Sequence, residues 1–237
     1  MKVAIMQPYL FPYLGYFQLI HSVDTFVFYD DVNYIKNGWI DRNRILVNGA
    51  PSYFKVPLVE ASSFKLIDEI EINYSIYDRW LNTLNKTIDH SYKKSKYYER
   101  TKSLMFDVLG RRYSSIAELA MESTVATMNC IGVKTEFCSS RSKHSNTKKG
   151  RQDRLIEICT KEEASVYINP IGGADLYSHE DFIAKGIQLM LLSPTLSPYS
   201  QKSKEFIPGL SIIDVLMNEE PAHILNLLRE CKITKAQ

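Results

Sequence analysis

The sequence predicts an α/β protein with a mainly parallel central sheet, a β-hairpin excursion and a helical insert. Short runs rich in β-branched and aromatic residues alternate with helical patterns at both ends of the chain. Residues 77–131 contain no proline and a single glycine, Gly110, and their apolar residues recur at helical spacing. Asn48-Gly49 joins two segments in the manner of a hairpin turn. We expect one α/β domain over residues 1–237, with residues 77–131 as the insert.

The N-terminal residues predict a strand, a turn and a helix in immediate succession. Residues 2–6 form an apolar run typical of a buried strand, and Pro8 and Pro12 exclude a helix from the turn that follows. Apolar residues then fall at helical spacing over 14–21, and residues 24–29 have the composition of a second buried strand. The three segments therefore resemble a βαβ unit with parallel strands.

After this unit, residues 32–38 are expected to form a loop. The hairpin is expected to pair residues 39–47 with residues 52–59, because the Asn-Gly dipeptide lies between them. Apolar and acidic residues alternate towards the end of 64–72, which predicts one more strand there.

The insert and the C-terminal half complete the α/β pattern. Helical spacing of apolar residues and short β-branched runs define these elements. We expect helices near residues 77–90, 96–110, 114–131, 153–161, 179–185, 211–217 and 221–230, and strands at 134–139, 166–169 and 188–192.

The composition narrows the class of protein. At 237 residues and 45% hydrophobic content, the chain is long enough to bury a sizeable core. A net charge of only +2 does not favour nucleic-acid binding by the whole molecule. We expect a cytoplasmic protein without membrane insertion, because no secretory signal and no long apolar segment is present. The four cysteines lack zinc spacing and a compact disulfide framework, and we expect reduced thiols.

Three segments are expected to meet at one edge of the sheet: residues 7–12, 139–154 and 169–175. Each follows a predicted strand, and ligands of α/β proteins bind where parallel strands end. The site prediction as a whole depends on this convergence.

The first segment supplies candidate catalytic and binding groups. Gln7, Tyr9, Tyr13 and Tyr16 provide more polar tips than packing requires, and the N-terminus of the following helix favours an anion. We assign Gln7, Tyr13 and Tyr16 as catalytic candidates and Tyr9 and Gly15 as binding candidates. The alternative is a turn shaped by its prolines and packed by its aromatic residues.

The second segment is the most charged part of the chain, because residues 141–154 carry a local charge of +5. Ser139, Lys148, Lys149 and Arg151 are candidate phosphate ligands. His144 in the same segment is a candidate general base. The alternative is a solvated surface loop without a ligand.

Acidic residues and glycines complete the candidate set. Asp30 and Asp31 end the second strand, where they could hold Mg²⁺ with nucleotide phosphates or bind sugar hydroxyls. Gly172 and Gly173 allow backbone N–H groups to approach a ligand without a Cβ clash. We predict no dedicated metal site.

Two arginines near the hairpin are further candidates. Arg42 and Arg44 would lie on one face of a strand and could clamp a carboxylate or phosphate. Trp39 nearby could stack on a ring, although a core position is the commoner use of tryptophan. The sequence contains no P-loop, dinucleotide fingerprint, metalloprotease pattern or nucleophilic triad.

The chain resembles the WbqC-like protein family over nearly its whole length. The resemblance lies in the Ile-Met-Gln-Pro-Tyr-Leu-Phe-Pro-Tyr-Leu-Gly-Tyr-Phe-Gln-Leu-Ile run at residues 5–20, in residues 30–32, 37–44 and 210–214, and in the paired glycines 172–173. That family is associated with O-antigen and other surface-polysaccharide gene clusters. The resemblance implies a cytoplasmic step on a nucleotide-linked sugar, and it supplies no list of catalytic residues.

A second resemblance concerns the first helix. Residues 13–16 are laid out like the His-x-Gly-His motif of nucleotidylyltransferases and pantothenate-synthetase-like amide ligases, with Tyr13 and Tyr16 at the histidine positions and Gly15 at the glycine. This likeness implies a Rossmann-type layout of the kind called HUP. Tyrosine does not offer the same cation to an ATP transition state, but its phenol can donate a hydrogen bond to a developing oxyanion.

These observations predict an enzyme that transfers an acyl or aminoacyl group to a nucleotide-linked amino sugar in surface-polysaccharide biosynthesis. The partner is a small-molecule sugar nucleotide, not a specific nucleic acid, and ATP or another activated acyl donor, with or without Mg²⁺, is the candidate co-reactant. The alternative is a non-catalytic sugar-nucleotide-binding or scaffold protein of the same pathway. The sequence does not determine the oligomeric state, and a homo-oligomer is compatible with it.

Overall fold

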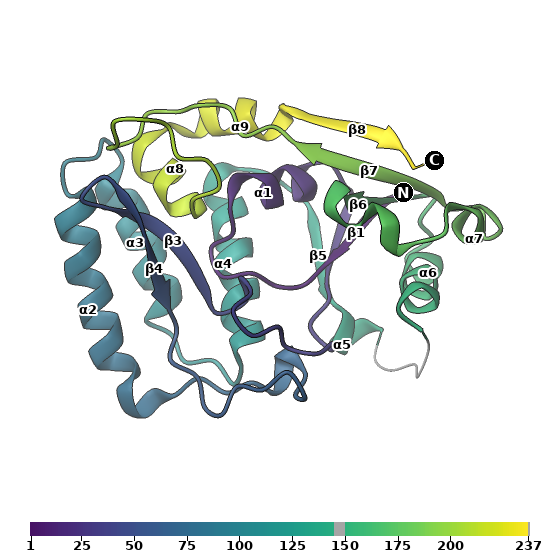
Figure 1. Ribbon diagram of the computed structural model, residues 1–237, viewed down its shortest axis with the longest axis horizontal. Helices are drawn as coiled ribbons and strands as arrows, with labels where there is room; N and C mark the ends of the chain where they lie inside the picture. Colours follow the sequence, from purple (N-terminus) through teal and green to yellow (C-terminus); the bar gives the residue numbers. More distant parts are fainter. Residues whose placement is uncertain (145–149, 237) are drawn as a thin grey trace.

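The computed structural model describes residues 1–144 and 150–236, and its centre is a six-stranded sheet (Figure 1). From one edge to the other, the strands are β5 (Glu136–Ser139), β2 (Thr25–Phe28), β1 (Lys2–Met6), β6 (Val166–Pro170), β7 (Gln188–Pro194) and β8 (Cys231–Lys235). The first five are parallel, and β8 pairs antiparallel with β7. The prediction of an α/β protein with a mainly parallel central sheet is confirmed.

Helices cover both faces of this sheet (Figure 1). On one face lie α1 (Leu14–His21), α4 (Ile116–Ile131) and α9 (Pro221–Arg229), and on the other lie α6 (Arg151–Lys161) and α7 (His179–Ile183). Each face has its own apolar cluster, the larger one under α1, α4 and α9 and the smaller one under α6 and α7. Parallel strands covered on both faces are buried, which explains why every residue of β2 is buried.

The three helices predicted within residues 77–131 are present. They are α2 (Tyr74–Tyr92), α3 (Tyr98–Leu109) and α4. Asn73 caps the N-terminus of α2 and Ser115 caps that of α4, each through a side-chain oxygen that accepts a backbone N–H. Gly132 ends α4 in the left-handed conformation, with φ of 85°.

The hairpin is also present, as β3 (Arg42–Val47) and β4 (Ala50–Lys55). Asn48 and Gly49 have φ values of 53° and 77°, the two consecutive positive angles of a type I′ turn. The short helix α8 (Ile212–Asn218) follows the long connection after β7 and packs against α3 and β3.

One predicted element is wrong. Residues 64–72 form a 3₁₀ turn, Ile67–Glu69, in place of a strand. The carboxylate of Glu69 accepts the backbone N–H of Leu66 at 2.9 Å, and this local bond competes with ladder pairing. Only isolated bridges remain, between Asn33 and Leu66 and between Leu58 and Ile72.

Three further elements were not predicted: β8, the one-turn helix α5 (Ser140–Lys143), and the 3₁₀ helix η2 (Ile171–Leu176). Strand β8 lies at the sheet edge and buries no residue fully, so its sequence carries little hydrophobic pattern. No helix among the described residues has both the length and the apolar character that a membrane crossing requires.

Candidate functional site

The carboxyl ends of the five parallel strands lie along one edge of the sheet. The chain passes from β1 to β2 on one side of β1, and it later returns to the other side of β1 as β6. The connections after β1 and β6 therefore leave the sheet in opposite directions and open a crevice between them. In open α/β sheets ligands bind in such a crevice. The turn after β1, α5 after β5 and η2 after β6 all begin at this edge.

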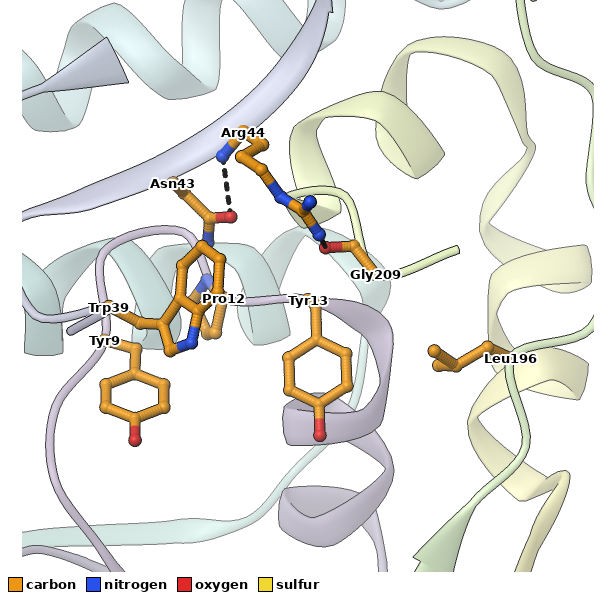
Figure 2. Close-up of a pocket in the computed structure, with 8 residues that line it drawn as sticks. All are labelled: Tyr9, Pro12, Tyr13, Trp39, Asn43, Arg44, Leu196 and Gly209. Atoms are coloured by element: carbon orange, nitrogen blue, oxygen red, sulfur yellow. Dashed lines mark hydrogen bonds between the residues drawn. The ribbon is translucent and has the colours of Figure 1, made fainter. Parts of the chain in front are cut away.

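Two adjoining cavities open at the crevice and share Tyr9, Tyr13 and Trp39; we call them together the aromatic cleft. One has a volume of about 270 Å³ and the other of about 200 Å³. The first, drawn in Figure 2, is also lined by Pro12, Asn43, Arg44, Leu196 and Gly209. The second reaches the ends of β6 and β7 and is also lined by Met6, Gly15, Tyr16, Leu19, Pro170, Leu192 and Pro194.

The turn between β1 and α1, which carries the tyrosines of the cleft, is fixed by distant parts of the chain. Phe11 has φ of 39°, a left-handed conformation that non-glycine residues rarely adopt. Nδ2 of Asn43 donates to the carbonyl oxygens of Leu10 at 3.0 Å and Phe11 at 2.8 Å. The Ser211 hydroxyl donates to the Phe11 carbonyl at 2.7 Å, and the Ser123 hydroxyl accepts the Phe11 N–H at 2.9 Å. These bonds hold the unusual backbone in place.

Asn43 is the functional residue that sequence reasoning missed. It lies between Arg42 and Arg44 in β3, so its side chain points to the opposite face of the strand, where it is only 2% exposed. A polar residue at the buried position of an alternating strand was the available signal, since a buried amide needs partners.

The hydroxyls of two tyrosines in the cleft are free to bind a ligand. Within the part of the chain that the structure describes, the hydroxyls of Tyr9 and Tyr13 make no hydrogen bond, and Figure 2 shows both pointing the same way out of the cleft wall. Burial raises the pKa of Tyr13, and burial together with the neighbouring Tyr13 raises the pKa of Tyr9. Both phenols are therefore neutral hydrogen-bond donors at neutral pH.

Arg44 provides a cation at the other end of the cleft. Its Cζ lies 5.5 Å from the ring centroid of Trp39, and its Nη2 donates to the carbonyl of Gly209 at 3.2 Å. Its Nε is buried and has no hydrogen-bond partner among the described residues. N–H groups of Arg44 thus remain for a carboxylate or phosphate.

Arg42, predicted as a partner of Arg44, is engaged elsewhere. Its guanidinium lies 4.7 Å from the ring centroid of Tyr53 and donates to the carbonyl oxygens of Gly38, at 3.1 Å, and Asn37. It is not among the residues that line the cleft.

The other residues predicted in the first turn have mainly structural contacts. Tyr16 is 2% exposed, and its hydroxyl donates to the carbonyl of Gln7 at 2.8 Å. A Cβ at Gly15 would lie 2.5 Å from Cε2 of Tyr13 and 2.8 Å from Cβ of Pro194. Glycine at this position therefore lets the Tyr13 ring lie against α1.

Asp30 is occupied by donors from the chain after β5. It is 3% exposed and accepts hydrogen bonds from the hydroxyls of Ser139 at 2.6 Å and Ser140 at 2.9 Å, and from the backbone N–H of Arg141 at 3.0 Å. The Asp30 carboxylate thus anchors α5 to the end of β2.

Asp31 forms a buried ion pair with Arg154 of α6 and also accepts the Ser140 hydroxyl. Arg154 is 7% exposed, with Cζ 5.6 Å from the ring centroid of Tyr29. A metal ion at Asp31 would have to displace this guanidinium, so the present arrangement favours a structural role for the pair.

The remaining residues of the basic segment are spread over the α6 face. The side chain of His144 is 2% exposed, and its Nε2 lies 2.6 Å from Oε1 of Glu162. Cys138, His144 and Glu162 together bring three potential metal ligands within 4.8 Å of one another. Arg151 is exposed in the first turn of α6. Lys148 and Lys149 lie outside the described residues.

The paired glycines differ from each other in their surroundings. A Cβ at Gly172 would have no atom within 4 Å, whereas one at Gly173 would lie 2.6 Å from Nδ2 of Asn169. Asn169 ends β6, is 5% exposed, and has no hydrogen-bond partner for this Nδ2 among the described residues. Neither glycine is among the lining residues of the aromatic cleft. The three predicted segments therefore share an edge of the sheet, but the cleft is lined mainly by the first segment, the region around Trp39 and the chain from the end of β7 onward. Of the third segment Pro170 lines it, and no described residue of the second segment does.

Comparison with known proteins gives two matches. A family model described as the WbqC-like protein family matches residues 7–225, which include the turn after β1, the hairpin and α8. The chain is also 25% identical over 235 residues to "Uncharacterized protein Rv1507c" of Mycobacterium tuberculosis (strain ATCC 25618 / H37Rv), an alignment that covers 98% of this chain and 99% of that protein. No solved structure gives a significant match.

Proposed function

The chain belongs to the WbqC-like protein family, and on that premise we propose that it is a cytoplasmic enzyme of bacterial surface-polysaccharide biosynthesis, including that of O-antigen. In this proposal it transfers an acyl or aminoacyl group to a nucleotide-linked amino sugar bound in the aromatic cleft. The observation that carries the proposal is the cleft itself, with its three aromatic side chains, two unpaired phenol hydroxyls and Arg44 at the point where the sheet topology reverses.

The chemistry of the cleft matches the parts of a sugar nucleotide. Aromatic faces stack on a sugar or base ring, and neutral phenols donate hydrogen bonds to ring hydroxyls. Arg44 suits a phosphate, because its planar guanidinium presents several N–H groups in a fixed geometry. The two cavities, about 270 and 200 Å³, together reach the lower end of the roughly 300–1,000 Å³ usual for small-molecule sites.

Amide formation suits a cleft of this composition. The amine of the sugar is the nucleophile: it attacks the acyl carbon, the bond to the leaving group breaks, and the amine proton leaves to the leaving group or solvent. The protein then has to hold two reactants together and donate a hydrogen bond to the oxyanion. We assign Tyr13 and Tyr9 as the hydrogen-bond donors to the oxyanion. Gln7, directly after β1, is the further catalytic candidate at this edge.

Activation of the acyl group belongs to the same proposal. ATP or a preformed activated acyl donor supplies the leaving group, and a Rossmann-type layout like that of nucleotidylyltransferases would place it at the same sheet edge. Arg151, exposed in the first turn of α6, is the described residue of the basic segment that we assign to its phosphates.

The test is a product assay. The protein is incubated with nucleotide-linked amino sugars, ATP and amino acids, and the sugar nucleotide is examined for a mass gain. We expect a product with the wild type, and a strongly reduced yield with Trp39→Ala and with Tyr9→Phe/Tyr13→Phe. Trp80→Phe is the matched control, because Trp80 lies in α2, away from the cleft. Absence of any product over a broad set of donors and sugars contradicts the proposal.

A second candidate is a non-catalytic sugar-nucleotide-binding protein of the same pathway. Among the described residues that line the cleft, the ionisable side chains are three tyrosines and Arg44, and such groups bind more readily than they transfer protons at neutral pH. Tight binding without product, together with normal pathway function of the Tyr9→Phe/Tyr13→Phe variant, would favour this candidate.

A further inference from the structure

Three residues of different elements come together beside the outer strand β5, on the α6 face of the sheet. Cys138 lies within β5, His144 follows α5, and Glu162 is the C-cap residue of α6. One ligand atom from each, a sulfur, an imidazole nitrogen and a carboxylate oxygen, lies within 4.8 Å of the other two. Cys138 and His144 are six residues apart and Glu162 lies 18 residues further on, a spacing that matches no common zinc motif.

His144 is the informative member. Its side chain is 2% exposed, and its Nε2 lies 2.6 Å from Oε1 of Glu162, so the two form a buried ion pair when the ring is protonated. Its Nδ1 is also buried and has no hydrogen-bond partner among the described residues. A buried imidazole nitrogen normally has a partner. The imidazole, the Glu162 carboxylate and the Cys138 sulfur thus converge on one place, where a cation could take all three as ligands.

Lys143 now provides the positive charge next to the Glu162 carboxylate. Glu162 is 6% exposed, and a buried carboxylate needs a cation. Nζ of Lys143 lies 2.7 Å from Oε1 of Glu162 and donates to Oε2 at 2.8 Å. The Lys143 side chain is 54% exposed, so its ammonium group can move from Glu162 into solvent.

We infer that Cys138, His144 and Glu162 form a binding site for Zn²⁺, in which the metal replaces the ammonium group of Lys143 at Glu162. A thiolate, an imidazole and a carboxylate are ligands that zinc accepts together, whereas Mg²⁺ and Ca²⁺ prefer oxygen alone. Three protein ligands leave a fourth tetrahedral position for water. None of these three residues lines the aromatic cleft, so the zinc site can be tested independently of the proposed function.

Bound zinc would tie α5 to the end of α6. Cys138 directly precedes Ser139, whose hydroxyl donates to Asp30 at 2.6 Å. The metal would therefore fix the start of the basic segment against the same sheet edge that carries the aromatic cleft. Because it would bind only the folded chain, zinc should also raise the thermal unfolding temperature.

The experiment measures metal binding by the full-length protein. Metal-free protein is dialysed against Zn²⁺, and its zinc content is determined; Co²⁺ is then used as a spectroscopic probe, because a cobalt–thiolate bond gives a charge-transfer absorption. We expect one metal ion per chain and a thiolate–cobalt band. Cys138→Ser should remove the band, whereas Cys130→Ser, which changes a thiol remote from the site, should keep it.

Two further variants separate a zinc site from a structural ion cluster. Glu162→Gln should weaken zinc binding by about 100-fold or more, beyond the roughly 10–100-fold typical of losing an outer-shell partner. Lys143→Met should leave zinc affinity unchanged or raise it, because Lys143 competes with the metal. Circular dichroism establishes that each variant is folded. Absence of a thiolate–cobalt band in the wild type, or zinc retention that is the same in Cys138→Ser and the wild type, would overturn the inference.

Discussion

The guanidinium of Arg44 lies over the indole of Trp39, with its Cζ 5.5 Å from the ring centroid. The two residues lie on either side of the start of β3, and Gly209, far along the chain, accepts a hydrogen bond from the same guanidinium. A cation and an aromatic face thus form one wall of the cleft at a place that the loop after β7 helps to close (Figure 2).

Replacing Trp39 by alanine should weaken binding of a nucleotide-linked amino sugar. Loss of one stacked ring costs about 1–3 kcal/mol, which corresponds to a roughly 5- to 150-fold rise in Kd. Isothermal titration calorimetry measures the change, and Trp80→Phe is the control, since the chain has two tryptophans and Trp80 packs against Tyr77 in the insert. Equal affinities for wild type and Trp39→Ala would rule out stacking on this ring.

The tyrosines of the first turn should separate into two classes. Tyr9→Phe and Tyr13→Phe should each weaken ligand binding by about 0.5–1.5 kcal/mol and leave stability unchanged, because their hydroxyls have no partner within the described protein. Tyr16→Phe should instead lower the free energy of unfolding by about 1–3 kcal/mol, because it leaves the partly buried carbonyl of Gln7 without its donor. Urea unfolding and ligand titration on the same three variants test this division. The reverse pattern would place the ligand elsewhere.

The same phenols predict a pH profile for binding. Since burial raises the pKa of Tyr9 and Tyr13, both phenols lose their protons only at a higher pH than a free tyrosine does, and both are donors around neutral pH. Their contribution to ligand affinity should therefore be constant around neutral pH and decline only in strongly alkaline solution. Comparison of the wild type with Tyr9→Phe/Tyr13→Phe at several pH values isolates the contribution. A difference in affinity that changes across the neutral range would contradict donation by these hydroxyls.

Two glycines provide a matched pair for testing close packing. Gly15→Ala should destabilise the protein by about 1–3 kcal/mol and impair the cleft, because the new Cβ would lie 2.5 Å from the Tyr13 ring and 2.8 Å from Pro194. Gly172→Ala should be close to neutral, since its Cβ would meet no atom within 4 Å. Thermal unfolding and ligand titration measure both effects. Similar stabilities for the two variants would show that the turn can shift to accept a side chain.

Asp214 should make stability depend on pH. It is buried and accepts hydrogen bonds from the hydroxyls of Tyr92 at 2.7 Å and Tyr199 at 2.8 Å. Burial raises its pKa above 3.8, so the folded state binds the proton more tightly than the unfolded state. The resulting contribution to stability is fully present below 3.8 and is lost as the pH rises through the raised pKa.

The measurement is urea unfolding of the wild type and Asp214→Asn at a series of pH values. As the pH falls through the raised pKa of Asp214 towards 3.8, the wild type should gain free energy of unfolding relative to the variant. A difference between the two proteins that stays constant with pH would show that this carboxyl group does not titrate in the predicted direction.

Where local chemistry determines the backbone, the sequence predicted the fold. The positive φ angles of Asn48 and Gly49 form the hairpin that the dipeptide indicated, and apolar residues at helical spacing produced α2, α3 and α4 close to their predicted limits. The same reasoning was wrong for residues 64–72, because a single bond from the Leu66 N–H to Glu69 favours a 3₁₀ turn over a strand. Alternating apolar and polar residues indicate which face of a strand would be buried, but they do not show that a neighbouring strand is available for pairing.

The candidate site shows the same division. Tyr9 and Tyr13 were selected from the sequence because the proline-containing turn after the first strand carries more polar side-chain tips than packing requires. Their arrangement with Trp39 and Arg44 depends on contacts that no local pattern contains, such as the bond from Asn43 to Phe11. Arg42 and Arg44 look equivalent in the sequence, and only their neighbours, Tyr53 for one and Trp39 for the other, separate a structural arginine from one that lines the cleft.

By itself, the sequence determined an α/β protein with a mainly parallel sheet and the strand, turn and helix at its N-terminus. The tertiary structure alone decided which polar groups are free and which are already paired. The physical reason is range: strand, helix and turn preferences arise from neighbouring residues, whereas the turn at Phe11 is held by Ser123 and Ser211, 112 and 200 residues further along the chain.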